Sequence, residues 1–363
     1  MINKRNILIW LNYIGGITYE MILSFIDYFG ELEEVWYASD KHLHEVMNNH
    51  RIIAEKMLKT RNKQFLDKLI NKTNTNTYHI VTILEADYPE KLKSIYNPPY
   101  VIYIKGKKNF DKPLIAMVGA RKSTAYGRWA AKKIATELGE WGVGVVSGLA
   151  LGIDAEGHKG ALDHGSYTIG VLGCGIDVCY PQSNHYLYKQ IEEKGCIVSE
   201  YGPGIEPYKH HFPARNRIIS GLSDGVVVIE ASEKSGTLIT VEHALEQGRD
   251  VYALPGNINC NQSKGTNRLI KEGAKILLDI EDILEDLRYK YPLNNIEAQK
   301  QIKENLSDEE LKVFNIIKQQ PIPIDLIAYK SGISISELNT ILTILELKGF
   351  ICQLSGKTFT LNK

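Results

Sequence analysis

The chain of 363 residues carries 43 basic and 43 acidic side chains, so its formal net charge is zero. It therefore has no overall positive field for nucleic acid, and an anion site requires local clustering of cations. A hydrophobic content of 44% is ordinary for a folded chain, and the length predicts two or three domains. No stretch approaches the ~18 apolar residues of a membrane helix, and no leader cleavage signal is evident. We expect a soluble cytoplasmic protein with no membrane partner.

The five cysteines are scattered, odd in number and never spaced C-x-x-C, which argues against a disulfide framework. Neither cysteine nor histidine shows the spacing of a metal site, and the motifs G-x-S-x-G and H-E-x-x-H are absent. The sequence therefore predicts no metal, no cofactor and no catalytic nucleophile.

Residues 1–75 are predicted to be helical, because apolar side chains recur at helical spacing in this region. The segment 14–17 contains two glycines and resembles the hairpin of a helix-hairpin-helix or SAM-like module, whose backbone N–H groups can hold a phosphate. Two glycines between helices are common, so a small packed helical domain is the favoured interpretation. The polar run 71–77 has no periodicity and predicts a linker. Beyond it, Val101 to Ile104 is predicted to form an edge strand.

The stretch 114–158 has the pattern of a βαβ unit. The apolar run 114–118 is followed by a glycine turn, a helical segment that contains Ala130 and Leu138, and a second apolar run, 143–146. The turn places Gly119, Arg121 and Lys122 at the start of a helix, where free N–H groups and a partial positive charge favour an anion. The turn matches neither G-x-G-x-x-G nor a P-loop, so a generic turn with two solvated cations is the alternative.

The same alternation of apolar runs and helical segments continues to residue 278. Further strands are predicted at 168–172, 196–198, 225–229, 251–254 and 274–278. This pattern predicts a Rossmann-like, doubly wound and mostly parallel α/β sheet covered by helices on both faces. Ligands of such sheets bind at the carboxyl ends of the strands, where the strand order reverses.

Turns at those carboxyl ends are rich in glycine and small hydroxyl residues. They are Gly119-Ala120-Arg121, Ser147-Gly148, Gly173-Cys174-Gly175 and Ser235-Gly236-Thr237. Together they predict a rim of backbone donors for a phosphate-bearing ligand.

The segment 208–217, YKHHFPARNR, mixes cations with aromatic rings. Lys209, Arg215 and Arg217 can bind phosphate oxygens, and Phe212 can stack on an unpaired base. This mixture favours a groove for single-stranded nucleic acid. A solvated basic loop with Phe212 in the core is the alternative.

Evidence for catalysis is weak. Asp154 is a plausible N-cap of a helix over 155–164, and it precedes His158 by four residues. Such a pair braces a helix more often than it moves protons. Glu230 and Glu242 flank the Ser235 turn and are interpreted as structural or ribose-contacting residues.

Residues 289–306 are predicted to be a linker, and 307–363 a winged helix with three helices and a hairpin. A capping box opens its first helix at Ser307, and Ser334 caps the third. The third helix carries Glu337 and Glu346, which suits duplex phosphates poorly. This favours a protein-contact or regulatory module over duplex DNA binding.

Several runs in one order resemble the DNA-processing protein A (DprA/Smf) family. They are VGARKSTAYG, VVSGLALGIDAEGH, GVLGCGIDVCYP, FPARNRIISGLS, VVVIEASEKSGTLITVEHALEQGRDVYALPGN and GTNRLIKEGA. The resemblance implies a Rossmann-like core over 76–288 between the helical domain (1–75) and the winged helix. It also implies single-stranded DNA binding during natural transformation, loading of the RecA recombinase, a homodimer formed through the core, and no nucleotide hydrolysis.

By this resemblance, the DNA pocket is a basic cleft of the core. The family's motif positions correspond here to Arg121, Ser147, Gly148, Phe212, Arg215, Asn216, Arg217, Ser235, Gly236 and Thr237. Gly119, Lys122 and Lys209 complete the candidate DNA- and phosphate-binding set. Gly157 departs from the family pattern, which usually has alanine there.

The main rival is a nucleoside-monophosphate phosphoribohydrolase of the same superfamily, with the motif P-G-G-x-G-T-x-x-E. The corresponding run here is 233–240. It lacks the Pro-Gly-Gly, and Thr240 stands where the glutamate belongs, which disfavours hydrolysis. A third possibility is a duplex-DNA regulator that acts through the winged helix.

Overall fold

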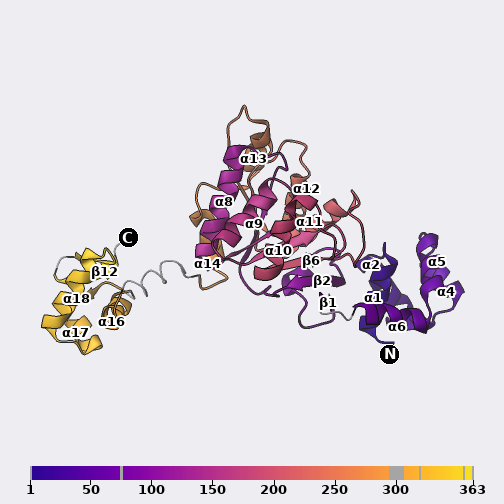
Figure 1. Cartoon of the computed structure of the whole chain (residues 1–363), viewed down its shortest axis with the longest axis horizontal. Helices are drawn as coiled ribbons and strands as arrows, with labels where there is room; N and C mark the ends of the chain where they lie inside the picture. The colour runs from indigo at the N-terminus through magenta and orange to yellow at the C-terminus, as the bar shows by residue number, and fades with distance from the viewer. Residues whose placement is uncertain (1, 74–76, 294–305, 319, 355, 362–363) are drawn as a thin grey trace. The chain divides into compact units, whose positions relative to one another are not determined.

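The computed structural model describes residues 2–73, 77–293, 306–318, 320–354 and 356–361 (Figure 1). The chain divides into two compact units, 1–293 and 294–363. The finer division into a helical domain, core and linker stays a prediction, and most of the predicted linker, 294–305, lies outside the described residues. Within the described residues, no helix has the length and apolar character needed to span a membrane.

The first unit begins with the helical region that the sequence predicts. Its helices are α1 (Lys4–Ile14), α2 (Tyr19–Phe29), α3 (Glu34–Tyr37), α4 (Asp40–Val46), α5 (Arg51–Thr60) and α6 (Lys63–Thr73). Side-chain caps from Asn3, Thr18 and Ser39 fix three helix starts. The linker prediction is wrong at 71–73, because α6 continues to Thr73, and residues 74–76 lie outside the described residues.

A mixed sheet forms the centre of this unit. In the described part it has nine strands, which are β1 (His79–Thr82), β2 (Val101–Gly106), β3 (Leu114–Val118), β4 (Gly144–Ser147), β5 (Thr168–Leu172), β6 (Cys196–Ser199), β7 (Gly225–Val228), β8 (Asp250–Ala253) and β9 (Lys275–Ile276). Their order is β1-β2-β6-β5-β4-β3-β7-β8-β9. The seven strands from β6 to β9 in this order are parallel, whereas β1 and β2 run antiparallel to their neighbours. The predicted doubly wound, mostly parallel α/β fold is thus confirmed.

The prediction of an edge strand at 101–104 is wrong. Strand β2 pairs with β6 on one side and with β1 on the other, and its residues 101–104 are buried. Strand β1 was not predicted, because it is only four residues long and lies next to the polar run that begins in α6.

Helices cover both faces of the sheet. They are α7 (Glu90–Lys93), α8 (Ala125–Glu140), α9 (Ile153–Asp163), α10 (His185–Lys194), α11 (His211–Gly221), α12 (Thr237–Glu246), α13 (Lys264–Lys271) and α14 (Glu281–Arg288), with short 3-10 turns at Gln182–Asn184 and Asn261–Ser263. Alternate residues of β3 face opposite layers, as expected of a strand buried on both sides. Ile115 and Met117 pack with α8, α9 and α14, while Ala116 and Val118 pack with α11 and α12.

The order in which successive strands are added to the sheet reverses at β3. From β3 it adds β4, β5 and β6 on one side, and it then returns to place β7, β8 and β9 on the other side. The loops that follow β3 and β7 therefore diverge, and they leave a crevice at the carboxyl ends of these two strands.

The second unit has the predicted winged-helix fold. Its elements are α16 (Asp308–Ile317), β10 (Ile322–Pro323), α17 (Ile324–Ser331), α18 (Ile335–Leu347), β11 (Ile351–Leu354) and β12 (Thr358–Leu361). In the described part, the strands form a small sheet in the order β10-β12-β11. The capping box at Ser307 and Glu310 is present, as is the N-cap at Ser334.

Candidate functional site

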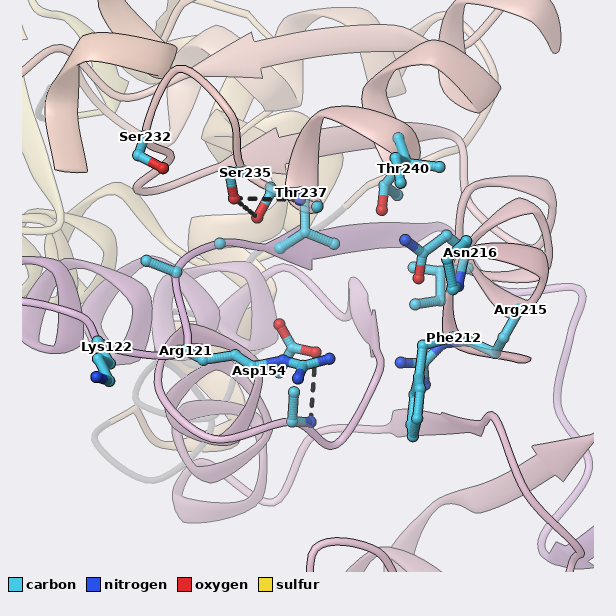
Figure 2. A pocket seen from close by; sticks show the side chains of 18 of the residues that line it. Arg121, Lys122, Asp154, Phe212, Arg215, Asn216, Ser232, Ser235, Thr237 and Thr240 are labelled. Atoms are coloured by element: carbon cyan, nitrogen blue, oxygen red, sulfur yellow. Dashed lines mark hydrogen bonds between the residues drawn. The ribbon is translucent and has the colours of Figure 1, made fainter. Parts of the chain in front are cut away.

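A cavity of about 810 Å³ lies at the switch point of the sheet (Figure 2). Its walls come from the loop after β3, the loop after β4, helix α11, and the turn that leads into α12. Ten predicted site residues line it: Gly119, Arg121, Lys122, Lys209, Phe212, Arg215, Asn216, Ser235, Gly236 and Thr237. Ser147, Gly148 and Arg217 do not line it, and neither does the Gly173-Cys174-Gly175 turn.

Helix α11 forms one wall, mostly through a single face, and Pro213 in its first turn also lines the cavity. Phe212, Arg215, Asn216 and Ile219 line the cavity at helical spacing i, i+3, i+4 and i+7. The sequence pattern predicts this helix over Arg215 to Leu222, whereas α11 begins at His211, four residues earlier. The earlier start brings Phe212 into this face.

The loop after β3 supplies the cations. Arg121 and Lys122 are exposed, and both line the cavity. The loop lies close to α9, because a Cβ at Gly119 would come within 2.7 Å of Ile153 Cγ1. Glycine is therefore required for this close approach.

A cation and two rings lie together beside this loop. The guanidinium carbon of Arg121 lies 5.6 Å from the ring centroid of Phe212, which is cation–π range. The Tyr180 ring lies 5.5 Å from Phe212, tilted by 40°, and its side chain is 44% exposed. Planar, partly exposed groups of this kind offer stacking surfaces to a base.

The wall opposite the cations carries hydroxyl groups (Figure 2). Ser235 Oγ accepts a hydrogen bond from Thr237 N at 3.2 Å and donates to Thr237 Oγ1 at 2.9 Å. Helix α12 begins at Thr237, which lines the cavity, so the positive end of its dipole lies at this wall. A Cβ at Gly236 would meet no atom within 4 Å, so the approach to this turn is open.

Arg215 forms part of the floor and is buried. Its Nη1 donates to the carbonyl oxygens of Gly148, at 2.8 Å, and Val171. Burial lowers the pKa of Arg215, and the nearby Asp154 charge opposes that shift. A Cβ at Gly148 would lie 2.5 Å from Arg215 Nη2. The main-chain bonds of Arg215 hold the loop after β4, and Gly148 is the residue that leaves room for the guanidinium.

The interpretation of Asp154 as an N-cap is wrong. Helix α9 begins at Ile153 after Gly152, so Asp154 lies in its first turn. Its carboxylate instead accepts hydrogen bonds from Gly148 N at 3.1 Å and Ala150 N at 3.4 Å, across the preceding loop. Burial raises the pKa of Asp154, and the charge of Arg215 opposes the rise.

Asp154 and His158 do not form a proton relay. His158 Nδ1 bonds Thr168 Oγ1 at 2.7 Å, and burial lowers the pKa of His158 to about 3. The imidazole is therefore neutral at ordinary pH. Glu230 is also occupied, because it accepts hydrogen bonds from Thr124 N at 3.0 Å and Thr124 Oγ1 at 2.5 Å.

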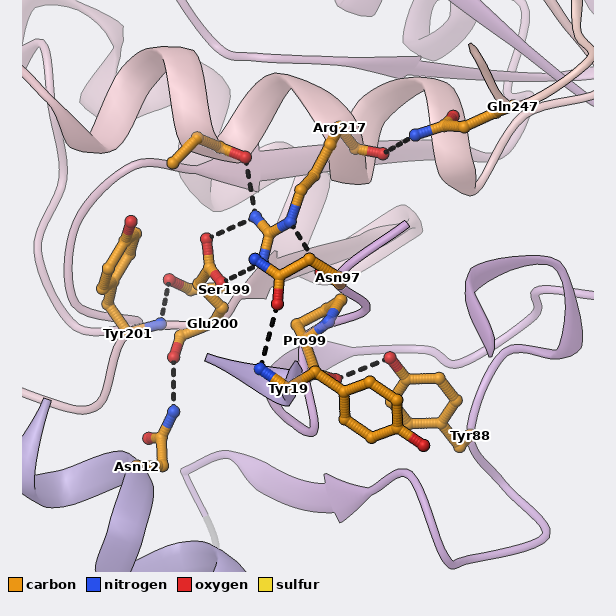
Figure 3. Close-up of polar contacts among 11 residues, drawn as sticks. Asn12, Tyr19, Tyr88, Asn97, Pro99, Ser199, Glu200, Tyr201, Arg217 and Gln247 are labelled. Atoms are coloured by element: carbon orange, nitrogen blue, oxygen red, sulfur yellow. Dashed lines mark hydrogen bonds and ion pairs between the residues drawn. The ribbon is translucent and has the colours of Figure 1, made fainter. Parts of the chain in front are cut away.

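Arg217 does not line the cavity, and its side chain extends from α11 to Glu200 and Asn97 (Figure 3). Its Nη1 and Nη2 donate to the two carboxylate oxygens of Glu200 at 2.9 and 2.6 Å, and its Nε donates to Asn97 O at 2.9 Å. The side chains of Arg217 and Glu200 are only 11% and 15% exposed. Asn97 in turn accepts from Tyr19 N at 3.0 Å, so this network joins α11 to the N-terminal helices. Arg217 therefore supports the fold in this structure.

Other cavity residues were not selected from the sequence. Tyr180, Ser232, Asn261 and Gln262 reach the cavity from loops that are distant along the chain. Tyr180 lies within the run GCGIDVCYP, where its aromatic character beside a glycine turn was the available signal.

The cavity therefore combines cations, stacking rings and small hydroxyls. Such a set can bind a phosphate-bearing ligand that carries a flat base. No group of three or more metal-binding side chains occurs among the residues that the structure describes.

Two family models match the chain. The model of DNA recombination-mediator protein A matches residues 79–288, and that of the DprA winged helix domain matches residues 297–357. DNA processing protein DprA of Streptococcus pneumoniae is 38% identical over 276 residues, which are 76% of this chain and 95% of that protein. Protein Smf of Synechocystis is 31% identical, with 96% of this chain and 97% of that protein covered.

Solved structures agree with these matches. The X-ray structure of the Streptococcus pneumoniae DprA has a TM-score of 0.68 at 36% identity and covers 77% of this chain and 97% of its own. A structure of DNA processing protein A from Helicobacter pylori, which was described for its mode of single-stranded DNA binding, has a TM-score of 0.54 at 32% identity. It covers 59% of this chain and 97% of its own.

Proposed function

Because this chain belongs to the DNA recombination-mediator protein A (DprA/Smf) family, we propose that it binds single-stranded DNA in the cavity beside β3 and β7. The observation that carries the proposal is the cluster of Arg121, Phe212 and Tyr180, in which a cation lies over one of two adjacent rings. Bases of unpaired DNA stack on such rings whatever their sequence, while cations bind the phosphates. The Helicobacter pylori relative, studied for its binding of single-stranded DNA, supports the same ligand class.

In this proposal Arg121, Lys122 and Lys209 bind phosphates, and Phe212 and Tyr180 stack on bases. Ser235 and Thr237, at the start of α12, offer hydroxyl groups to a phosphate. Asn216 lies on the same face of α11 as Phe212 and contacts the DNA beside it. Arg215 and Gly148 shape the floor of the cavity.

The protein then hands its DNA to a RecA recombinase, in keeping with the description of the family as a recombination mediator. It acts as a homodimer through the core, during DNA processing linked to natural transformation. The winged helix serves a protein contact or regulation. No cofactor and no catalytic step are needed for these tasks.

The rival function is hydrolysis of a nucleoside monophosphate. A cavity with hydroxyls at a helix start would suit the phosphate of such a ligand. Against it, Thr240 lines the cavity at the position of the motif's glutamate, and Glu230 is bound to Thr124. We therefore favour DNA binding without hydrolysis.

The test is fluorescence anisotropy with labelled oligo-dT over a series of salt concentrations, with AMP turnover followed in the same samples. The variant Arg121→Gln/Lys209→Gln removes two cations from the cavity. The control Lys189→Gln/Lys194→Gln removes two exposed cations from α10, which does not line it.

Loss of two phosphate contacts should reduce the slope of log K against log salt by about 1.4 and weaken binding about 25-fold at 0.1 M salt. The control variant should bind nearly as the wild type does, and AMP should stay intact. Equal loss in both variants, or release of ribose phosphate, would overturn the proposal.

A further inference from the structure

A second cavity, of about 600 Å³, lies in the first unit between the N-terminal helices and the loop that follows β6. Helices α1, α5 and α6 contribute one wall, and residues 202–205 contribute another. Two hydrogen bonds of Asn12 connect α1 to the sheet and to the loop that follows β6. Asn12 donates to Glu200 O at 3.1 Å and accepts from Tyr103 Oη at 2.9 Å. The cavity is therefore a feature of one packed body.

The charge of this cavity is positive. Lys56, Lys59 and Lys72 line it, and none of its lining residues is Asp or Glu. All three lysines are exposed, and among the described residues no carboxylate lies within ion-pair distance of any of them. In a chain with zero net charge, three lysines that have no carboxylate within ion-pair distance among the described residues form a local site for an anion.

Aromatic side chains accompany the lysines. Tyr13 is 54% exposed, and its ring lies 5.3 Å from that of Phe65 in an edge-on arrangement. Tyr103 lies at the buried side of the cavity, 6.0 Å from the ring of Tyr78. Cations beside an exposed ring such as Tyr13 are typical of a surface that binds phosphates and unpaired bases.

One short loop separates the two cavities. Ile205 lines the second cavity and Pro207 lines the first, so the Cα atoms of these residues are at most ~7 Å apart. Gly175 N donates to Ile205 O at 2.7 Å, and Gly204 N donates to Asp177 Oδ1 at 2.8 Å, which fixes this loop to the loop that follows β5. A DNA strand at a rise of about 3.4 Å per nucleotide crosses such a distance in about two nucleotides.

We propose that the second cavity binds the continuation of the single strand held in the first cavity, so that the DNA path crosses the 202–209 loop onto the N-terminal helices. This inference rests on the proposed function of the first cavity. Lys59 and Lys72 bind phosphates of the continuing strand, and Tyr13 stacks on one of its bases. The N-terminal helical region thereby lengthens the binding site.

The test compares two oligonucleotides on the full-length protein. An oligo-dT of about four nucleotides is too short to fill the first cavity and also cross the 202–209 loop, whereas one of about 20 nucleotides can reach both cavities. The variant Lys59→Gln/Lys72→Gln is compared with the control Lys63→Gln/Lys68→Gln, which removes two exposed lysines of α6 that do not line the cavity. Tyr13→Ala is compared with Tyr37→Ala, whose tyrosine is also exposed and lies outside the cavity.

We expect Lys59→Gln/Lys72→Gln to weaken binding of the long oligonucleotide about 25-fold at 0.1 M salt and to lower its salt slope by about 1.4. Tyr13→Ala should weaken it about fivefold or more. Binding of the short oligonucleotide should be unchanged, and both controls should resemble the wild type. Long-oligonucleotide binding that matches the controls would overturn the inference, as would equal losses for both lengths. Failure of the wild type to bind either length would instead refute the proposed function itself.

Discussion

Replacing Arg217 with methionine separates a structural role from a DNA-binding role. The substitution leaves the Glu200 carboxylate, which is 15% exposed, without the two charged hydrogen bonds at 2.9 and 2.6 Å. It also removes the bond to Asn97 O and so weakens the junction with the N-terminal helices. Removing one partner of a largely buried ion pair costs about 3 kcal/mol of unfolding free energy.

The assay is urea unfolding followed by tryptophan fluorescence. All four tryptophans (Trp10, Trp36, Trp129 and Trp141) lie in the first unit, so the fluorescence signal reports the unfolding of that unit and not of the winged helix. A cycle with Arg217→Met, Glu200→Gln and the double variant isolates the pair. Because each single change leaves one charge or one set of donors uncompensated, the double variant should be more stable than the sum predicts, by about 1 kcal/mol or more.

The DNA affinity of Arg217→Met, unlike its stability, should stay close to that of the wild type. Folded Arg217→Met protein should bind oligo-dT within about twofold of the wild type and with the same salt slope, because no phosphate contact is lost. If the variant were as stable as the wild type and its DNA affinity fell with a reduced salt slope, the placement of Arg217 in the Glu200 network would be refuted.

Two further predictions concern stability, one at Gly148 below the cavity and one at the buried His158. Gly148→Ala should lower the unfolding free energy by about 1–3 kcal/mol, because its Cβ would lie 2.5 Å from the Arg215 guanidinium that is bonded to main-chain oxygens. Gly236→Ala, whose Cβ meets nothing, is the control, and equal stability of the two variants in urea would contradict this packing. Burial lowers the pKa of His158 from 6.5 to about 3, so stability is complete above pH 6.5 and falls as pH decreases, by about 2 kcal/mol at about pH 5. His158→Gln should flatten the curve of unfolding free energy against pH, surface His44→Gln should not, and an unchanged curve in His158→Gln would show that another group is responsible.

The sequence was sufficient for the core of the fold. The apolar runs at 114–118 and 225–229 predicted buried parallel strands, and the turns after them predicted the edge at which the cavity lies. These signals are local, because a strand buried on both faces is apolar throughout and a glycine turn marks its end.

It was harder to predict from the sequence which side of α11 each residue occupies. In the sequence, FPARNR is one continuous basic and aromatic run, and all of its cations were assigned to DNA. In a helix, residues two positions apart lie on different sides, so Phe212, Arg215 and Asn216 share the cavity while Arg217 does not. Starting the helix at His211 instead of Arg215 would have revealed this from the sequence.

Non-local pairing accounts for the remaining differences. Strand β2 was expected at an edge because nothing near it in the chain indicates that β1 and β6 flank it. Likewise, Asp154 has the residue type and position of an N-cap, yet its carboxylate is used by the backbone of the preceding loop. Both outcomes depend on three-dimensional contacts that periodicity and spacing do not encode.

The most direct test of DNA binding in the cavity is ultraviolet cross-linking of oligo-dT to the full-length protein, with the cross-linked residues mapped by mass spectrometry. We expect cross-links at Phe212 and Tyr180, whose rings lie beside Arg121 in the cavity. Cross-links confined to residues 306–361 of the winged helix would contradict the proposal and place the DNA on the second unit.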